Sequence, residues 1–539
     1  MQLYDISMVN EGLEFDADVL VIGGGPAGTW AAWNAAQAGA SVVLVDKGYC
    51  GSSGATAPSG TGVWVIPPTT EDREEAKAQR EALGGYLADH DWMDRVLDRT
   101  WSNMELIERW GYPFPREDGE TVRRSLQGPE YMRLMRKAVA RTGVKILDHS
   151  PALELLVDGS GNVAGARGVQ RQDERDWTVR SGAVVIATGG CAFLSKALGC
   201  NNNTGDGYLF AGEAGAEFSG MEFSNQYAVS TVFGSVTKTA HYSWAVFTNE
   251  AGEDIKAVKD GHHSAATIGR TLIHGPVYAQ LIKAKERPEV QAFLRLAQPN
   301  FFLPFDRSGI NPFTERFPVT LTLEGTVRGT GGIRITDKTC ASTVPGLYAA
   351  GDAATRERIC GAFTGGGSHN AAWAMSSGSW AGEGAAGFAL RLGASRKSRR
   401  LGGAGTPASF SESQAAIAAV KNEVMPLEKN LFRTDAGLRA SLAVLNGLWA
   451  SVSSQRGVDG AGARDAQRSR EAAALVATAR WAYTSALARK ESRGMHRRTD
   501  FPQSDPLQHR HQIVSGVDKI ALRYQHVVPR LPVGDVVTA

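Results

Sequence analysis

The feature that most constrains this chain is a short apolar run, residues 19–22, that leads directly into a glycine-rich turn. A run of this length between polar residues and glycines is typical of a buried parallel strand. Gly23, Gly25 and Gly28 follow it with G-x-G-x-x-G spacing. The first glycine permits a tight turn, the second lets backbone N–H groups reach a pyrophosphate, and the third lets the next helix pack closely on the strand.

The residues after this turn complete a dinucleotide-binding unit. Pro26 and Ala27 open a predicted helix that continues through residues 29–37, and its positive N-terminal end would face the phosphates. A second apolar run, residues 41–45, ends in Asp46, whose carboxylate can accept hydrogen bonds from the adenosine ribose hydroxyls. Strand, glycine turn, helix, second strand and terminal acid in this order favour a dinucleotide site over a plain glycine turn.

Composition excludes several classes of partner. Lys+Arg total 58 and Asp+Glu total 56, so neither nucleic acid nor an anionic membrane surface is expected. The five cysteines are scattered without C-x-x-C spacing, which predicts no metal site and no iron–sulfur cluster in this chain. Residues 1–5 carry no signal pattern, and no stretch approaches the roughly 20 apolar residues that cross a bilayer. We therefore expect a cytoplasmic protein without membrane insertion.

The order of sequence patterns predicts several domains. Strands that end in glycines, at residues 183–190 and 346–352, indicate that a nucleotide-binding domain spans 1–225 and resumes over 333–395. The alternation weakens between these parts, so residues 226–332 are predicted to form an inserted capping domain. An Ala/Leu/Arg-rich segment with helical periodicity predicts a C-terminal helical domain and tail over 409–539.

Taken together, these motifs resemble the flavoprotein family of fumarate reductase, succinate dehydrogenase, L-aspartate oxidase and the α subunit of adenylylsulfate reductase. The resemblance covers most of the chain and rests on an ordered set of segments: 23–28, Asp46, 187–190, 204–207, 221–223, 331–333, 345–352 and 489–496. It implies an α/β fold with a Rossmann-like FAD-binding domain, an inserted α+β capping domain and a C-terminal helical domain. It also implies FAD rather than NAD.

The same resemblance assigns the cofactor contacts. The first glycine turn would hold the ADP half, Asp352 would bond the ribityl chain, and the helix that opens at Ser368 would face the flavin. Residues 48–64 form a loop rich in small and hydroxyl residues, here called the small-residue loop. Covalently flavinylated members carry a histidine after the serine of this loop, whereas Gly54 follows Ser53 here, so non-covalent FAD is expected. The predicted cofactor-binding residues are Gly23, Gly25, Pro26, Ala27, Gly28, Asp46, Lys47, Ser53, Gly54, Thr56, Ala57, Thr188, Gly189, Asp206, Gly351, Asp352, Ser368 and His369.

The dicarboxylate-binding residues of the family are missing. By motif position, Tyr227 and Val327 replace its two histidines, and His241 and Thr364 replace its two arginines. Two carboxylates need fixed bidentate cations, and an unpaired buried charge costs several kcal/mol. Fumarate reduction is therefore not expected. The remaining side chains, with Trp64, Tyr242 and Trp244 nearby, suit a less charged or aromatic substrate.

Four residues are candidates for the chemistry, each with a structural alternative. His241 takes the place of the proton-shuttling arginine, and a histidine can exchange a proton near neutral pH. Arg328 could bind an anionic group or pair with an acid. Tyr227 could donate a proton or simply pack. His369 could act on the substrate or contact the flavin through its backbone alone.

Three functions with a bound flavin remain open from the sequence, beside a fourth, a nicotinamide-dependent dehydrogenase without flavin. The first is an FAD-dependent oxidoreductase that transfers a hydride between flavin and a small, non-dicarboxylate substrate. The second is a flavoprotein resembling the adenylylsulfate reductase α subunit, which exchanges electrons with a separate ferredoxin-type iron–sulfur subunit. The third is a flavin-binding scaffold without turnover. An oligomer is compatible with each.

Overall fold

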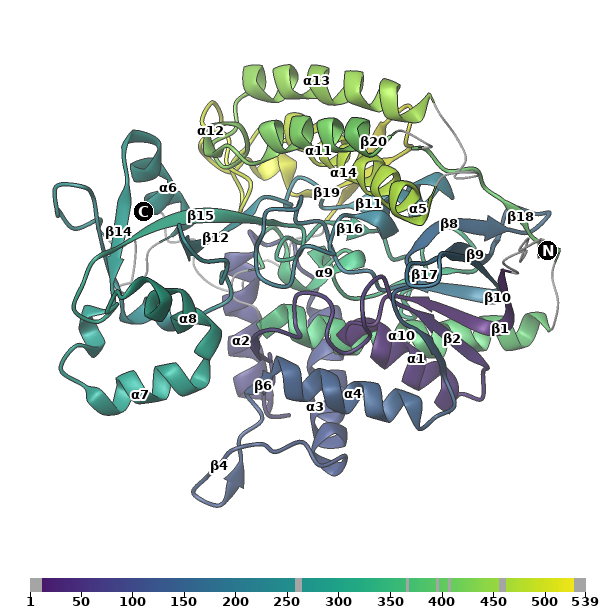
Figure 1. Ribbon diagram of the computed structural model, residues 1–539, viewed down its shortest axis with the longest axis horizontal. Coiled ribbons are helices and arrows are strands. Elements are labelled where there is room, and N and C mark those ends of the chain that lie inside the picture. Colours follow the sequence, from purple (N-terminus) through teal and green to yellow (C-terminus); the bar gives the residue numbers. More distant parts are fainter. Residues whose placement is uncertain are drawn as a thin grey trace, which may run out of the picture.

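A computed structural model describes residues 12–256, 264–364, 368–393, 397–405, 409–454 and 462–527. A large twisted sheet with helices α1 and α10 beside it lies on one side of Figure 1, and the segment with α6, α7 and α8 extends from the other. Helices α11, α13 and α14 lie together along a third side. Within these ranges, no helix is long and apolar enough to span a bilayer. Residues 1–5, on which the targeting expectation depends, lie outside them.

The large sheet has the order β18-β8-β9-β10-β1-β2-β7, and β17 also pairs with β10. Strand β1 lies between β10 and β2 and runs parallel to both, with Ile22 opposite Ile186 and Val45. Its strands are β1 (Leu13–Ile22), β2 (Val42–Val45), β7 (Lys145–Leu147), β8 (Ala152–Val157), β9 (Val163–Gln170), β10 (Arg175–Ile186), β17 (Leu347–Ala349) and β18 (Arg399–Arg400). The parallel arrangement of β1, β2, β7 and β10 confirms the predicted Rossmann-like α/β core.

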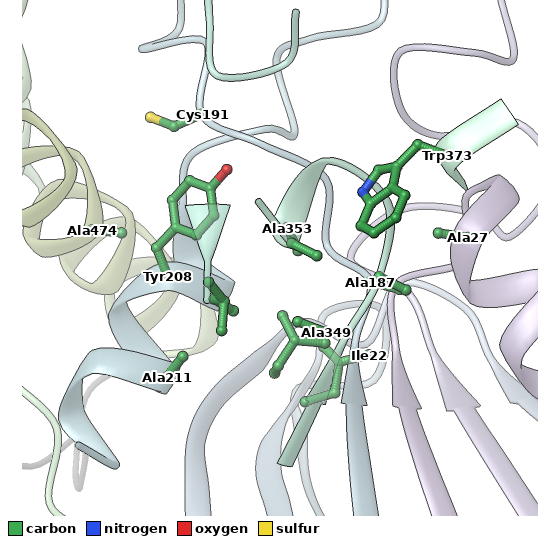
Figure 2. Close-up of a cluster of buried hydrophobic side chains, with 14 of the residues drawn as sticks. Ile22, Ala27, Ala187, Cys191, Tyr208, Ala211, Ala349, Ala353, Trp373 and Ala474 are labelled. Carbon is green, nitrogen blue, oxygen red and sulfur yellow. The ribbon is translucent and has the colours of Figure 1, made fainter. Parts of the chain in front are cut away.

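Small residues let two helices approach each other over this sheet. A side chain at Gly378 or Gly382 of α10 (Ser368–Leu392) would meet the Ala27 or Ala31 carbonyl oxygen of α1 (Pro26–Gln37) at 2.4 and 2.2 Å. The buried cluster beneath them includes Ile22 and residues from distant segments, with Tyr208 and Trp373 on opposite sides (Figure 2). This packing brings the first turn of α1 next to Gly378 in the middle of α10.

Between β2 and β7 the chain alternates helices with short strands. The segment from residue 70 to residue 140 contains helices α2 (Thr70–Leu83), α3 (His90–Arg109) and α4 (Gly128–Ala140). A hairpin of β4 (Arg116–Glu117) and β5 (Glu120–Thr121) interrupts it, and β6 (Ser125–Gln127) pairs with β3 (Gly60–Gly62). That last pairing fixes the small-residue loop against α4, a long-range contact that local sequence cannot reveal.

Residues 226–325 contain an antiparallel sheet with the order β12-β15-β14-β13. Its strands are β12 (Gln226–Thr231), β13 (Val246–Thr248), β14 (Val277–Gln280) and β15 (Phe317–Gly325). The helices beside it are η1 (His241–Trp244), α6 (Ala265–His274), η2 (Ile282–Ala284), α7 (Pro288–Ala297) and α8 (Pro299–Ser308). The phenylalanines of α8, which are Phe301, Phe302 and Phe305, are buried between these elements. This arrangement is the α+β type predicted for the inserted segment.

The C-terminal segment contains helices α11 (Phe410–Val424), α12 (Leu427–Asn430), α13 (Asp435–Ser453) and α14 (Ala463–Ala488). The last part of this segment differs from the predicted helical domain. After η4 (Pro506–Gln508), strands β19 (Arg510–Ser515) and β20 (Ala521–His526) form a hairpin. Strand β19 pairs with β11 (Phe218–Ser219), which pairs with β16 (Gly332–Ile333). The remaining short helices are α5 (Asp206–Glu213), η3 (Gly351–Ala353) and α9 (Glu357–Cys360).

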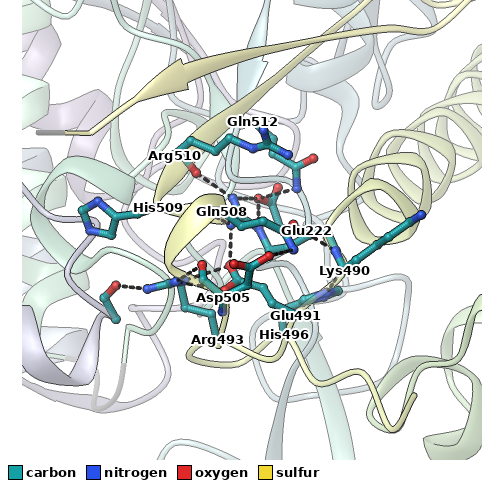
Figure 3. Close-up of polar contacts among 12 residues, drawn as sticks. Glu222, Lys490, Glu491, Arg493, His496, Asp505, Gln508, His509, Arg510 and Gln512 are labelled. Carbon is teal, nitrogen blue, oxygen red and sulfur yellow. Dashed lines mark hydrogen bonds and ion pairs between the residues drawn. The ribbon is translucent and has the colours of Figure 1, made fainter. Parts of the chain in front are cut away.

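A buried ion network joins this hairpin region to the rest of the chain (Figure 3). Arg489 pairs with Glu222 and with Glu491, each at 2.7 Å, and Arg493 pairs with Glu491 at 2.8 Å. Both carboxylates are fully buried. Because an unpaired buried charge is costly, this network fixes the register between the C-terminal segment and the strand region near Glu222.

Candidate functional site

A cavity of about 600 Å³ opens where the parallel strands β1, β2 and β10 end. Its lining comes from the turns after these strands, the small-residue loop, the start of α10 and three segments of the inserted region. In open parallel sheets, ligands bind beyond the carboxyl ends of the strands. The predicted dinucleotide turn and two predicted catalytic residues of the inserted segment, His241 and Arg328, therefore line one cavity.

The glycine turn has the geometry its spacing predicts. Gly23 has φ +112, and a side chain at Gly28 would lie 1.7 Å from the Gly23 carbonyl oxygen. A side chain at Gly25 would meet no protein atom within 4 Å. Gly25 is the N-cap of α1 and supplies no side-chain cap, and the first turn of the helix carries no acidic residue. Because the first N–H groups of a helix lack intrahelical acceptors, those at the start of α1 are available to an anionic ligand, whereas the Gly24 N–H is bonded to Asp46.

Asp46 lines the cavity, but its carboxylate also shapes the loop around it. It accepts hydrogen bonds from Gly24 N at 2.5 Å, Gly48 N at 2.6 Å and Ser53 Oγ at 2.7 Å. These contacts hold the first glycine turn and the small-residue loop together. The sequence predicted a ligand contact for Asp46 and did not predict that its carboxylate holds these two loops together.

Lys47 links three distant segments at the cavity edge. Its Nζ lies 2.7 Å from Asp206, 2.6 Å from Glu471 and 2.8 Å from the Thr204 hydroxyl. Burial alone would lower the pKa of Lys47, but the two carboxylates outweigh it and raise the pKa above its ordinary value. The small-residue loop is thereby fixed to the start of α5 and to α14.

The second predicted glycine turn is held from two sides. Tyr208 donates its hydroxyl to the Asp352 carbonyl oxygen at 2.6 Å, and Trp373 donates Nε1 to the Gly351 carbonyl oxygen at 3.0 Å. The Asp352 carboxylate lines the cavity and pairs with Arg356, which is fully buried. Burial raises the pKa of Asp352.

All but four of the predicted cofactor-binding residues line this cavity; the exceptions are Gly28, Ala57, Ser368 and His369. The His369 ring packs on Trp64 at 4.7 Å between ring centroids, and burial lowers the pKa of His369 to about 3. Asn370, one residue later, lines the cavity instead. The start of α10 therefore reaches the cavity through Asn370 and not through the predicted residues Ser368 and His369.

His241 lies in the cavity lining with only 4% of its surface exposed. Its ring packs against Phe301 and Phe302, and neither ring nitrogen has a hydrogen-bond partner. Burial lowers the pKa of His241 to about 4, so the imidazole is neutral at pH 7. A neutral ring offers one N–H donor and one unprotonated nitrogen, which suits it to exchange a proton.

Arg328 also lines the cavity, next to a buried carboxylate. Its Nη1 lies 2.9 Å from Glu324 Oε2, and the same carboxyl group lies 3.4 Å from Lys238 Nζ through Oε1. Lys238 and Gln298 line the cavity as well, although no motif in the sequence indicated either residue. Lys238 follows β12 in an irregular segment, so only the fold reveals its position.

Tyr227 points away from the cavity. Its hydroxyl donates to the Val424 and Met425 carbonyl oxygens, both at 3.0 Å, at the end of α11. The aromatic residues Trp64, Tyr242 and Trp244, predicted to suit an aromatic substrate, are not part of the lining either. The structure thus brings His241 and Arg328 together and separates Tyr227 and the His369 side chain from them.

Comparison with known proteins agrees with this geometry. The family model described as an FAD binding domain matches residues 18–369, and the model described as fumarate reductase flavoprotein C-term matches residues 422–533. This chain belongs to the fumarate reductase and succinate dehydrogenase flavoprotein family. It is an FAD-dependent oxidoreductase, which confirms the resemblance, the cofactor and the enzyme class predicted from the sequence.

Individual relatives match over nearly their whole length. The chain is 26% identical to the fumarate reductase flavoprotein subunit of Mycobacterium tuberculosis, covering 90% of this chain and 92% of the relative. It is 29% identical to the L-aspartate oxidase of the same species, covering 93% and 96%. Among solved structures, a variant of Escherichia coli quinol fumarate reductase aligns with TM-score 0.80 at 22% identity, covering 97% and 99%. Adenylylsulfate reductase of Archaeoglobus fulgidus aligns with TM-score 0.74 at 18% identity, covering 96% and 97%. These structural matches establish the fold.

Proposed function

We propose that this flavoprotein transfers a hydride between FAD and a small substrate that is not a dicarboxylate, with His241 as the proton partner. The observation that carries this proposal is the neutral, unpartnered His241 ring in the lining of the cavity that contains the nucleotide-binding turn. FAD, when bound, supplies the two-electron acceptor or donor for such a reaction.

The residues of the chain have separable roles in this proposal. The open N–H groups at the start of α1 bind the pyrophosphate, and the Gly351–Asp352 turn orients the cofactor from the other strand end. The unprotonated nitrogen of His241 takes a proton from the substrate during dehydrogenation, and its N–H returns one in the reverse direction. Arg328 binds and orients the substrate.

The inserted segment closes the cavity over these groups. Asn300 Nδ2 donates to the Pro58 carbonyl oxygen of the small-residue loop at 2.7 Å, and Gln298 Nε2 donates to the Lys238 carbonyl oxygen at 3.0 Å. Both residues belong to the junction of α7 and α8. We propose that this junction acts as the cap that excludes water from the bound substrate.

We further propose that FAD is held without a covalent bond. Gly54 occupies the small-residue loop position at which covalently flavinylated relatives carry a histidine, and it lines the cavity. Among the described lining residues, His241 is the single histidine, and it is assigned to the proton transfer.

The test is anaerobic mixing of the purified holoprotein with a panel of small substrates while the flavin absorbance is followed. A substrate should bleach the wild-type flavin, and His241→Asn should retain FAD but bleach at least about 100-fold more slowly. Lys283→Met is the control, because Lys283 is an exposed residue of η2 outside the cavity lining. Equal bleaching rates in the wild type and His241→Asn would refute the assigned role.

A second candidate is a flavoprotein subunit that passes electrons to an iron–sulfur partner. All five cysteines are buried and unpaired, and the described residues contain no group of ligands that could hold a metal ion. Electrons that leave the flavin must therefore go to another molecule. Rapid reoxidation by a ferredoxin-type protein with slow peroxide formation would favour the partner, and rapid peroxide formation in air would favour a free-standing oxidase. The scaffold alternative predicts no bleaching by any substrate.

A further inference from the structure

Two cations share one carboxylate at the substrate side of the cavity. Glu324 is fully buried and lies 2.9 Å from Arg328 Nη1 and 3.4 Å from Lys238 Nζ. The Thr237 hydroxyl also donates to it at 2.6 Å. Burial alone would raise the pKa of Glu324, but the two cations outweigh it and lower the pKa, so the carboxylate stays ionised. One positive charge of this trio remains without a matching negative charge.

The neighbouring groups do not supply that negative charge. Cys200 Sγ lies 3.2 Å from Lys238 Nζ, but burial raises the pKa of the thiol, so it is neutral. The Asp352 carboxylate is already paired with Arg356, and the His241 ring is neutral at pH 7. The substrate side of the cavity therefore carries an excess of one positive charge, most of it shielded from water.

From this charge balance we infer that the substrate carries one carboxylate-type negative charge, which Lys238 and Arg328 bind together. This inference rests on the proposed function and narrows the class of substrate from a small non-dicarboxylate molecule to a monoanion. A single anionic group would neutralise the excess charge and accept hydrogen bonds from both cations. A dianion would bring a second charge into the cavity without a partner, at a desolvation cost that nothing here offsets.

The lining residues next to Arg328, at the junction of α7 and α8, and at the start of α10 are uncharged. Ala297, Val327 and Ala371 supply apolar surface, while Gln298 and Asn370 supply neutral polar groups. The Asn370 Oδ1 atom is buried and has no hydrogen-bond partner. These groups fit a substrate whose remaining part is apolar or carries a neutral hydrogen-bond donor.

The experiment uses the FAD-loaded protein and measures binding by the perturbation of the flavin spectrum, so it does not depend on turnover. Propionate, propionamide and succinate are titrated at constant ionic strength as monoanion, neutral and dianion probes. We expect propionate to bind at least tenfold more tightly than either of the others. Lys238→Met should weaken propionate binding at least tenfold, Lys238→Arg should restore most of it, and Lys283→Met should leave it unchanged.

A second variant reverses the preference. Glu324→Gln raises the excess charge from one to two, so succinate should bind more tightly relative to propionate by at least tenfold. If this buried substitution prevents folding, Arg328→Met, which removes the excess charge, should abolish the advantage of propionate over propionamide. Equal binding of propionate and propionamide by the wild type would overturn the inference, as would tighter binding of succinate. Loss of flavin bleaching with intact anion binding would instead refute the proposed hydride transfer alone.

Discussion

Alanine at Gly28 and alanine at Gly25 perturb the nucleotide-binding turn by two different routes. A Cβ at Gly28 would lie 1.7 Å from the Gly23 carbonyl oxygen, whereas real Cβ contacts are not shorter than 3.0 Å. The start of α1 would have to move by about 1.3 Å relative to β1, and overpacking of this kind costs about 1–3 kcal/mol. We expect Gly28→Ala to destabilise the protein with and without FAD.

The Gly25 substitution should act on the cofactor alone. Its Cβ would meet no protein atom within 4 Å, and its φ of −75 is open to alanine, so apoprotein stability should change by less than about 1 kcal/mol. The same Cβ would block the close approach of the pyrophosphate to the backbone. Each charge-assisted hydrogen bond lost costs about 1.5–3 kcal/mol, which weakens FAD binding about 10- to 150-fold.

Thermal unfolding of the apoproteins and fluorescence titration with FAD separate the two effects. Gly447→Ala is the matched control, because Gly447 lies within α13 with no atom near the added Cβ, and it should be neutral or slightly stabilising. The reasoning fails if Gly25→Ala binds FAD as tightly as the wild type. It also fails if the Gly28→Ala apoprotein unfolds at the wild-type temperature.

Three further outcomes follow from single side chains. The pKa of His241 is about 4 in the folded protein, below its ordinary value of 6.5. The stability that the neutral His241 ring contributes is therefore complete above pH 6.5 and is lost as the pH falls from 6.5 through 4. Dehydrogenation rates should stay constant from pH 8 to about 5 and fall near pH 4; an inflection near pH 6.5 would contradict this. Tyr227→Phe removes the donor to two buried carbonyl oxygens, so it should lower stability by about 1–3 kcal/mol and leave flavin reduction unchanged; a reduction defect at intact FAD content would restore its catalytic role. Lys47→Met leaves Asp206 without its ion pair, whereas Glu471 keeps its pair with Arg468 at 2.7 Å, so the variant should lower the free energy of unfolding by about 3–5 kcal/mol. An unchanged melting temperature would refute the role of Lys47 in fixing these segments together.

The sequence predicted the nucleotide-binding core because its signals are local. Gly23, Gly25 and Gly28 lie within six residues, and strand, turn and helix around them each have a periodic pattern. The strand that ends at Gly351 was also inferred from a local pattern, and the resemblance added the position of His241. The glycines lie where the chain turns at the end of a strand. The backbone conformation of such a turn requires glycine, so the turn can be recognised in the sequence.

The parts that could not be predicted depend on contacts between distant segments. Lys238 lies after β12 and Glu324 lies within β15, and the ion pairs of Glu324 with Lys238 and with Arg328 have no sequence signature. Tyr227 occupies a motif position, but its hydroxyl reaches carbonyl groups about 200 residues away. The β19–β20 hairpin was missed because its partner strand β11 lies far earlier in the chain. The predicted domain boundaries remain predictions, although the antiparallel sheet falls within residues 226–332.

The most direct test of this account is acid precipitation of the freshly purified protein, followed by absorbance measurement of the supernatant and the pellet near 450 nm, the wavelength region where flavins absorb. We predict that FAD appears in the supernatant at about one molecule per chain, because the cavity holds it through backbone N–H groups and side chains without a covalent bond. Flavin that stays with the pellet would contradict non-covalent binding. A colourless protein that takes up no added FAD would contradict the central assignment of the cavity.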